Sequence, residues 1–348
     1  MKRSQSTIAR RGQCSHNPAM KLLSIAIVAL MGGCAAGFNS GSHSDPRALM
    51  SIKLATWNME WLVSPPAFRA LRSSCLPKGT EPAGRQRYLP CDVANGQERS
   101  AQDFAALARY AQKLDADVIA LEEVDGESAA KLVFSGYAFC FTGRSAVQNT
   151  GFAIRRGIPF RCGPDYLPLS LGDTVRRGKE LLLFPDEPRE LRLLAVHLKS
   201  GCPRGSLDSG RTECSKLARQ VPLLEEWIHR QAAAGHVFAV LGDFNRDLLH
   251  ESGPPRTANG TQLNVYAQLD HGDAPEADLR NAAADELFIN CSAAQNFSGY
   301  IDNILLSRTL AQRRVAGGFE RLTYSMPEAL QRKLSDHCPV AVRIRLVD

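Results

Sequence analysis

The chain has 348 residues, of which 44% are hydrophobic and 22% charged, a composition ordinary for a soluble enzyme and long enough for one large α/β domain. Its formal net charge of +6 is concentrated at one end, because residues 1–34 hold five basic side chains and no acidic one. The rest of the chain therefore carries a net charge of only +1, which excludes overall charge as an argument for a nucleic-acid partner.

Residues 1–34 are typical of a secretory leader. Lys21 precedes a short apolar stretch and then small residues, and this stretch is too short for an ordinary membrane-spanning helix. Gly33-Cys34 resembles a bacterial lipoprotein processing site, which predicts an exported protein tethered to a membrane through lipid on Cys34. The alternative is a cut near Ala36, with release into the periplasm or the medium. Met20 is an alternative start to Met1.

Eight cysteines follow the leader, at positions 75, 91, 140, 162, 202, 214, 291 and 338. An even number of cysteines in an exported protein favours disulfides. Short loops suggest the pairs Cys75–Cys91 and Cys202–Cys214, and sequence leaves the other pairings open. A zinc site is the alternative, but no Cys-x-x-Cys or paired Cys/His spacing supports it.

The remaining chain reads as a linker at residues 35–48 and one domain at residues 49–348. The pattern of apolar residues predicts strands that alternate with amphipathic helices, which indicates an α/β fold with mixed sheets. The expected strands are residues 52–57, 117–121, 151–155, 181–184, 191–198, 237–241, 300–306 and 340–346, and the expected helices are residues 99–114 and 217–228.

Polar residues lie at the ends of these strands, where ligands of open α/β sheets bind. Each has an ordinary explanation as a turn or cap, but together they supply acids, histidines, asparagines and a lysine. They are Asn58, Glu60, Glu122, Glu123, His197, Lys199, Asp243, Asn245, Asp302, Asn303, Asp336 and His337. Serine hydrolases, P-loop enzymes and zincins are excluded, because no Gly-x-Ser-x-Gly, Walker loop or His-Glu-x-x-His occurs.

The order of these motifs resembles the endonuclease/exonuclease/phosphatase superfamily, whose members are DNase I-like. The motifs are Trp57-Asn58, Leu121-Glu122-Glu123-Val124, His197, Gly242-Asp243-Phe244-Asn245, Ile301-Asp302-Asn303-Ile304-Leu305 and Ser335-Asp336-His337-x-Pro339. The resemblance implies a four-layer sandwich, in which two stacked mixed β-sheets are flanked by helices. It also implies phosphoester hydrolysis that depends on a divalent metal, with Mg²⁺ expected and Mn²⁺ or Ca²⁺ as alternatives.

The resemblance also implies a set of metal ligands. Glu123 would be the principal ligand of Mg²⁺, with Asn58 beside it, and Asp336 would be a carboxylate on the metal side or the water side. Glu122 departs from the family pattern, which usually has Gln there, and we expect it to add negative charge near the metal.

The catalytic roles follow in the same way. His337 would be the catalytic histidine and Asp302 its orienting partner. Asp243 would align or deprotonate the attacking water, and Asn245 would hold a phosphate oxygen. His197 matches the second histidine of the DNase I and sphingomyelinase branches, but no carboxylate that orients it can be identified in the sequence.

The leading interpretation is an exported, monomeric nuclease, with nucleic acid as substrate and no protein partner implied. Basic clusters are available to grip a phosphate backbone, although any of them can also be a solvated surface. The clusters are Arg155-Arg156, Arg176-Arg177-Lys179 and Arg313-Arg314. The alternatives are a sphingomyelinase-like lipid phosphodiesterase, a small-molecule phosphatase, and a non-catalytic surface binding protein that kept the fold.

Overall fold

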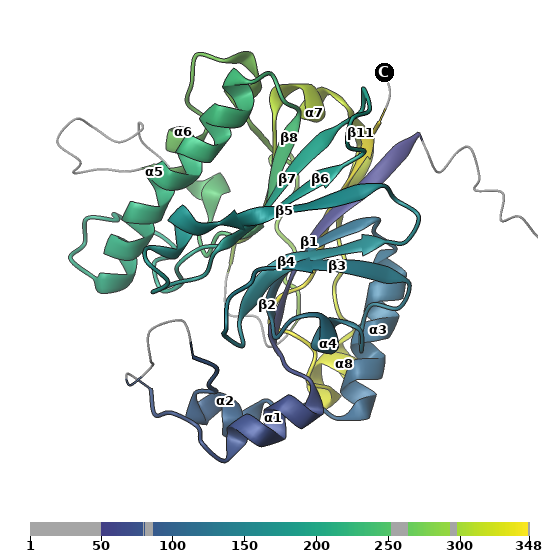
Figure 1. Cartoon of the computed structure of the whole chain (residues 1–348), viewed down its shortest axis with the longest axis vertical. Helices are drawn as coiled ribbons and strands as arrows, with labels where there is room; N and C mark the ends of the chain where they lie inside the picture. The colour runs from purple at the N-terminus through teal and green to yellow at the C-terminus, as the bar shows by residue number, and fades with distance from the viewer. Residues whose placement is uncertain (1–49, 79, 81–85, 252–263, 293–297, 347–348) are drawn as a thin grey trace, which may run out of the picture. The chain divides into compact units, whose positions relative to one another are not determined.

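The computed structural model describes residues 50–78, 80, 86–251, 264–292 and 298–346 (Figure 1). The predictions for the leader, the linker and Cys34 lie outside these residues. The described part contains two six-stranded mixed sheets, and the predicted fold class is confirmed. Within this part of the chain, no helix has the length and apolar character needed to cross a membrane.

The first sheet is built around the parallel pair β1 and β2, with antiparallel neighbours outside it. Its strand order is β11-β12-β1-β2-β4-β3. The strands are β1 (Ser51–Leu62), β2 (Val118–Val124), β3 (Tyr137–Phe141), β4 (Asn149–Arg155), β11 (Arg314–Arg321) and β12 (Val340–Arg345).

The second sheet repeats this plan, with β7 and β8 as its parallel pair. Its strand order is β5-β6-β7-β8-β10-β9. The strands are β5 (Phe160–Tyr166), β6 (Gly178–Leu183), β7 (Leu191–His197), β8 (Phe238–Asp243), β9 (Arg280–Asn281) and β10 (Asp302–Leu306).

The two longest helices are those predicted from the sequence. Helix α3 (Ala101–Leu114) begins at Ser100, which forms a reciprocal capping box with Asp103, and α5 (Thr212–Ala233) leads into β8. The shorter helices are α1 (Pro65–Arg72), α2 (Cys91–Gly96), α4 (Glu127–Ala130), α6 (Val265–Leu269), α7 (Arg308–Gln312) and α8 (Met326–Gln331), with 3₁₀ turns η2 (Leu167–Ser170), η3 (Leu248–His250) and η4 (Pro275–Ala277).

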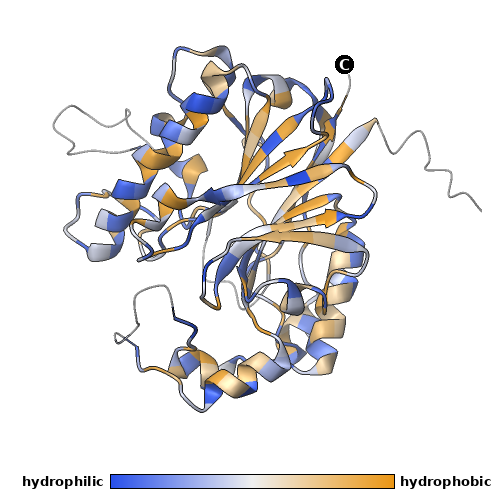
Figure 2. Ribbon diagram, viewed as in Figure 1, coloured by the Kyte–Doolittle hydropathy of each residue, from blue (hydrophilic) through white to orange (hydrophobic). Residues whose placement is uncertain are grey.

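Alternation along the strands divides the core into three layers. On β1, Leu54 points into the space between the sheets, where it joins a cluster with Leu193 of β7. Its neighbour Ala55 points the other way, toward the apolar face of α3, and Val240 of β8 packs toward α5 in the same manner. Figure 2 shows strands rich in hydrophobic residues and helices with mixed surfaces. The result is helix, sheet, sheet and helix.

All eight cysteines after residue 34 are paired. The predicted disulfides Cys75–Cys91 and Cys202–Cys214 are both present. Two further disulfides, whose pairing the sequence left open, are Cys140–Cys162 and Cys291–Cys338. Cys140 lies on β3 and Cys162 on β5, so this disulfide joins edge strands of the two sheets. The alternative of a cysteine zinc site is therefore wrong.

Candidate active site

The candidate site lies where the two parallel strand pairs end. The carboxyl ends of β1 and β2 carry Asn58 and Glu123, and those of β7 and β8 carry His197 and Asp243. Strand β10 runs antiparallel to β8, so its first residue, Asp302, lies opposite Asp243. Strand β12 runs antiparallel to β1, which brings the preceding residues Asp336 and His337 to the same edge. All eight predicted site residues, Asn245 among them, form one connected group of contacts.

His337 and Asp302 form the closest pair of opposite charges in the site. The Nδ1 atom of His337 lies 2.9 Å from both carboxylate oxygens of Asp302, and both side chains are buried. Burial alone would lower the pKa of His337, but Asp302, followed by Asp243 and Asp336, raises it well above its usual value. The Nε2 atom lies 3.8 Å from Asp336 Oδ1 and 4.0 Å from Asp243 Oδ2. His337 is therefore held in a fixed orientation, with its charged form favoured.

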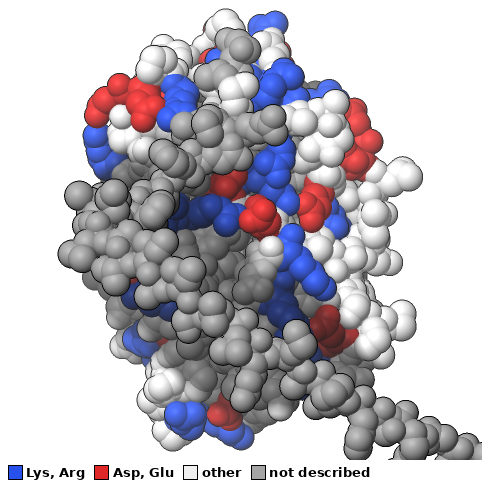
Figure 3. Space-filling view, turned by 90° about the vertical axis from the view of Figure 1, so that its right-hand side faces the viewer, with Lys and Arg blue, Asp and Glu red and all other residues white. Residues whose placement is uncertain are grey.

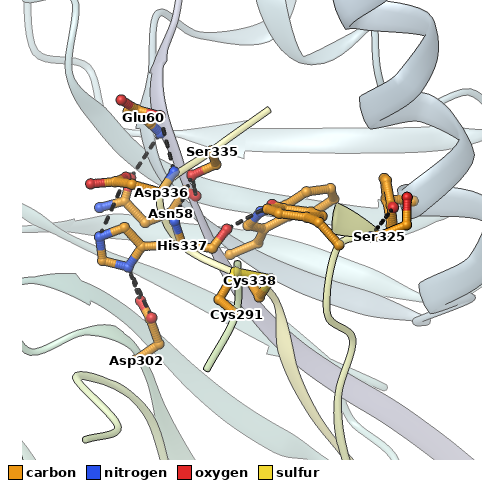
Figure 4. The surroundings of a disulfide bond; sticks show 12 residues. Asn58, Glu60, Cys291, Asp302, Ser325, Ser335, Asp336, His337 and Cys338 are labelled. Atoms are coloured by element: carbon orange, nitrogen blue, oxygen red, sulfur yellow. Dashed lines mark hydrogen bonds and ion pairs between the residues drawn. A yellow bond between two sulfur atoms is a disulfide. The ribbon is translucent and has the colours of Figure 1, made fainter. Parts of the chain in front are cut away.

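The backbone of His337 is fixed from several sides (Figure 4). Its N–H donates to Ser335 Oγ at 3.1 Å, and this hydroxyl donates to the Asn58 carbonyl at 2.8 Å. Its carbonyl accepts a hydrogen bond from Tyr324 Oη at 2.6 Å. The next residue, Cys338, forms the disulfide with Cys291. The loop before β12 is thus tied to β1 and to the disulfide.

Asp243 lies at the centre of the site and accepts three hydrogen bonds. Asn58 Nδ2 and Asn245 Nδ2 each donate to its Oδ2 at 3.0 Å, and the Asn245 backbone N–H donates to Oδ1 at 2.7 Å. Burial, with a contribution from Asp302, raises the pKa of Asp243 to about 7. Asn58 thus bonds to Asp243 across the two sheets. Asn245 also donates to the Leu198 carbonyl at 3.2 Å, so its amide orients Asp243.

His197 directs its Nε2 atom at two carboxylates. Its Nε2 is 3.4 Å from Asp243 Oδ2 and 3.8 Å from Glu123 Oε1. Burial, followed by the nearby Arg176, lowers its pKa well below the usual value, so the neutral ring is favoured. Within the described part of the chain, its buried Nδ1 has no hydrogen-bond partner. The carboxylates nearest His197 are therefore those on its Nε2 side.

Glu122 and Glu123 are adjacent in sequence but have different surroundings. Glu122 is fully buried and accepts from Thr56 Oγ1 at 3.2 Å. Burial, followed by Asp302 and Asp243, raises the pKa of Glu122 well above its usual value. The neutral acid is therefore favoured for Glu122, and it can donate a hydrogen bond as Gln does. The added negative charge that the sequence led us to expect is not favoured. Glu123 accepts from the Trp61 backbone N–H at 3.2 Å and keeps 16% of its side chain exposed.

Four of the nine described non-glycine residues with positive φ lie in or beside this site. Glu60, Trp61, Glu123 and Asn245 have φ angles of 44°, 55°, 58° and 54°, in the left-handed region that glycine prefers. Each such residue costs about 1–3 kcal/mol and persists only where the surrounding structure enforces it. Glu60 also accepts from the Asp336 backbone N–H at 3.0 Å, and burial, followed by Asp336, raises its pKa to about 7. Sequence reasoning noted Glu60 as a polar strand end but gave it no role.

The basic clusters divide into residues held in ion pairs and one residue of the site. Arg155 binds Asp115 and Asp117, Arg177 and Lys179 bind Asp165, and Arg314 binds Glu286. One face in Figure 3 shows basic and acidic residues interspersed among neutral ones. Arg176 differs, because its charge acts most strongly on Glu123 and Asp243 and its buried Nε has no partner among the described residues. One sequence signal pointed to this difference, because Arg176 lies just before a strand. The sequence pattern instead grouped Arg176 with Arg177 and Lys179 as a basic cluster.

The donor set fits a hard divalent cation. Asp243, Asp302 and His337 each offer a ligand atom within 4.8 Å of the others. Four carboxylates, those of Glu123, Asp243, Asp302 and Asp336, lie within 4.0 Å of the two histidines of the site. Carboxylate and amide oxygens are the ligands that Mg²⁺ and Ca²⁺ prefer, and a bound cation relieves repulsion between carboxylates.

A two-sheet α/β sandwich with a His–Asp pair and clustered carboxylates at one end defines a class of enzymes that hydrolyse phosphoesters. The model of the Endonuclease/Exonuclease/phosphatase family matches residues 55–337, and the chain belongs to this family. Members of this family are metal-dependent phosphoester hydrolases.

Solved structures with the same fold include TDP2 proteins and an AP endonuclease, all at low sequence identity. A truncated TDP2 from Caenorhabditis elegans has 13% identity and a TM-score of 0.52, covering 85% of this chain and 98% of that one. The AP endonuclease LMAP from Leishmania major has 18% identity and a TM-score of 0.50, covering 87% of this chain and 89% of that one. A humanized TDP2 from D. rerio has 14% identity and a TM-score of 0.51, covering 84% and 98%. No curated protein matches the sequence.

Proposed function

We propose that this protein is an exported, metal-dependent phosphodiesterase that hydrolyses nucleic acid. The observation that carries the proposal is the pairing of His337 with Asp302, with the ring's Nε2 facing Asp243 and Asp336. An imidazolium fixed in this way donates a proton or a hydrogen bond to an oxygen of a phosphate in transfer. The carboxylates around it supply the base and the oxygen ligands that the same reaction requires.

In the proposed reaction, water attacks phosphorus in line with the leaving oxygen, and negative charge builds on the phosphoryl oxygens. Asp243, held by Asn58 and Asn245, orients the water and accepts its proton. His337 opposes the charge from the other side, with Asp302 keeping Nδ1 protonated. A divalent cation, Mg²⁺ in this proposal, would be held by Glu123, Asn58 and Asp336 and would act as a Lewis acid. The Asn245 amide gives up its hydrogen bond to the Leu198 carbonyl and donates to a phosphate oxygen instead.

Two observations support nucleic acid as the substrate. The Arg176 guanidinium donates to the Leu198 carbonyl at 2.6 Å and acts electrostatically on Glu123 and Asp243, and we assign it to a neighbouring phosphate of a polyanion. One protein of the same fold, from Leishmania major, is an AP endonuclease. The surface clusters contribute less than the sequence suggested, because acidic partners neutralise most of them. Export is supported by four disulfides. We retain the tether through Cys34 as part of this proposal.

One observation favours a lipid phosphodiesterase as the second candidate. Leu287 is 88% exposed and Ile289 is 57% exposed. Both precede Cys291, whose disulfide partner Cys338 follows His337. Exposed apolar residues connected in this way to the catalytic loop are suited to contact with a membrane surface.

One panel tests these candidates. The substrates are plasmid DNA, RNA, sphingomyelin vesicles and a small phosphodiester, each with Mg²⁺, Mn²⁺, Ca²⁺ or EDTA. We expect cleavage of DNA or RNA that is lost in EDTA and decreases with salt. His337→Ala serves as the negative control for contaminating nucleases. Cleavage of sphingomyelin alone would overturn the nuclease assignment, and inactivity toward all substrates with every metal would favour a binding protein.

A further inference from the structure

A second group of ligand-type side chains lies on helix α5, apart from the catalytic residues. Glu225 and His229 are four residues apart on this helix, so they share one face. His271 reaches the same place from the segment after α6. One ligand atom from each lies within 4.8 Å of the other two. Glu225 Oε1 is 4.0 Å from His229 Nε2 and 3.9 Å from His271 Nδ1.

We propose that Glu225, His229 and His271 form a binding site for a transition-metal ion of the Zn²⁺ class. Two imidazoles and one carboxylate are the three protein ligands of one known class of zinc site, in which a fourth position stays open. Imidazole ligands favour Zn²⁺, Cu²⁺ or Ni²⁺, whereas the catalytic donors are mainly oxygens, which favour Mg²⁺ or Ca²⁺. The two sites therefore differ in the metal that they select.

The carboxylate is already oriented for this role. Gln268 Nε2 donates to Glu225 Oε2 at 2.7 Å, which leaves Oε1 directed at both histidines. A residue that hydrogen-bonds to a metal ligand without touching the metal fixes that ligand in place. Losing such a hydrogen bond typically weakens metal binding by about 10–100-fold. His229 Nε2 contacts the His271 carbonyl oxygen, and a metal at this nitrogen would bind the tautomer protonated at Nδ1 and displace the carbonyl contact.

Space for the ion and a fourth ligand is also present. A hollow of about 310 Å³ lies beside the cluster, lined by His229, His271 and Asp273 among others. At Gly272, an added Cβ would lie 3.1 Å from His229 Nε2, so the glycine keeps the approach to this nitrogen open. About 38% of the His229 side chain and 64% of the His271 side chain are exposed, which gives a metal a path from solvent.

The cluster lies at the opposite end of the second sheet from the catalytic residues. Trp227, between the two helical ligands, packs on Phe238 at the start of β8, with ring centroids 5.6 Å apart. Asp243 is at the other end of β8, roughly 16 Å away at about 3.3 Å per residue. A metal here would connect α5 to the segment after α6 without touching the catalytic groups. Its loss is therefore measurable separately from catalysis.

The test measures Zn²⁺ bound per chain by equilibrium dialysis and elemental analysis, on the full chain. We expect the wild type to bind one more Zn²⁺ than His229→Ala, His271→Ala or Glu225→Gln. Gln268→Ala should bind the same ion with about 10–100-fold weaker affinity. His250→Ala is the matched control, because its side chain is 62% exposed, close to the value for His271. It should bind as many ions as the wild type.

A second measurement separates this site from the catalytic one. Cleavage of a phosphodiester with saturating Mg²⁺ and no Zn²⁺ should be unchanged in His229→Ala and His271→Ala. Circular dichroism checks that each variant is folded, and Glu225→Gln preserves side-chain size if an alanine variant fails to fold. Equal Zn²⁺ uptake by the wild type and the folded ligand variants would overturn the proposal. An equal loss in His250→Ala would also overturn it, because binding would then be unspecific.

Discussion

At the scale of single residues, the site depends on one buried pair. Asp302 holds Nδ1 of His337 at 2.9 Å, and removing either partner removes the positioned acid. We expect His337→Ala and Asp302→Asn to lower kcat for phosphodiester cleavage by about 10²–10⁴-fold. Asp243→Ala should lower it similarly, through loss of the base. Thermal melting should change little for His337→Ala and Asp243→Ala, and variants that keep most of their turnover would refute these roles.

Glu122 and Glu123 provide a matched pair of adjacent carboxyl groups. Glu122 lies inside and contacts Thr56, so Glu122→Gln keeps size and hydrogen bonding and should retain most activity. Glu123 lies at the open side, 3.8 Å from His197, and Glu123→Gln should raise the Mg²⁺ concentration needed for half-maximal activity by at least about tenfold. Metal titrations of the two variants measure this difference. A larger effect of Glu122→Gln than of Glu123→Gln would show that Glu123 is not the principal metal ligand.

Residue types at strand ends could be read from the sequence, but most of their pairings could not. Asp302 and His337 are 35 positions apart, and only the resemblance to a family connected them. The contacts of Asn58 with Asp243 cross between the two sheets, and no local pattern encodes such a contact. The role of Arg176 was missed because a run of basic residues usually indicates a solvated surface. Among the described residues, Arg176 Nε is buried without a hydrogen-bond partner, and this is a property of the folded chain.

At the scale of elements, the strands missed from the sequence share one property. The strands β11, β3, β5 and β9 are the outer strands of the two sheets. A central strand such as β8 is buried on both faces, and its run of apolar residues is visible in the sequence. The edge strand β5 contains Arg161, Gly163 and Pro164, and three of its seven residues are exposed. The central strands and both long helices were predicted, while the edges required tertiary context.

Helix α8 docks on α3 through Glu328, which gives a prediction about pH. Glu328 accepts from Arg109 and Tyr110 Oη, both at 2.6 Å. The hydrogen bond from Tyr110, followed by that from Arg109, lowers its pKa from 4.5 to about 2. The stabilisation is therefore fully present above about pH 4.5 and is lost as the pH falls toward 2.

Replacing this carboxylate should reveal the same pH dependence. Glu328→Gln should lower the free energy of unfolding at pH 7 by about 1 kcal/mol, a small value because the side chain is 27% exposed and screened by solvent. Denaturant unfolding of both proteins between pH 7 and pH 2 measures the difference, which should shrink below about pH 5. A constant difference over this range would show that the charge contributes nothing.

At the scale of the whole molecule, two sheets of the same plan bring their parallel pairs together. Each pair ends in polar residues, and stacking the sheets places both sets at one edge. Neither sheet holds the site alone, because Asn58 and Glu123 come from one sheet and His197 and Asp243 from the other. A constraint on the loops that carry these residues therefore acts on catalysis more directly than one at the outer edges of the sheets.

The disulfide Cys291–Cys338 is such a constraint, because it holds the residue after His337 and closes a loop with a sequence separation of 47. We expect Cys291→Ser with Cys338→Ser to lower the free energy of unfolding by about 2–4 kcal/mol and also to lower kcat. The control is Cys140→Ser with Cys162→Ser, which removes the disulfide between β3 and β5. It should lower stability by a similar amount and leave kcat unchanged, measured where both variants are fully folded. If both pairs change kcat equally, the disulfide beside His337 acts on the fold as a whole, and its specific effect on the catalytic loop is disproved.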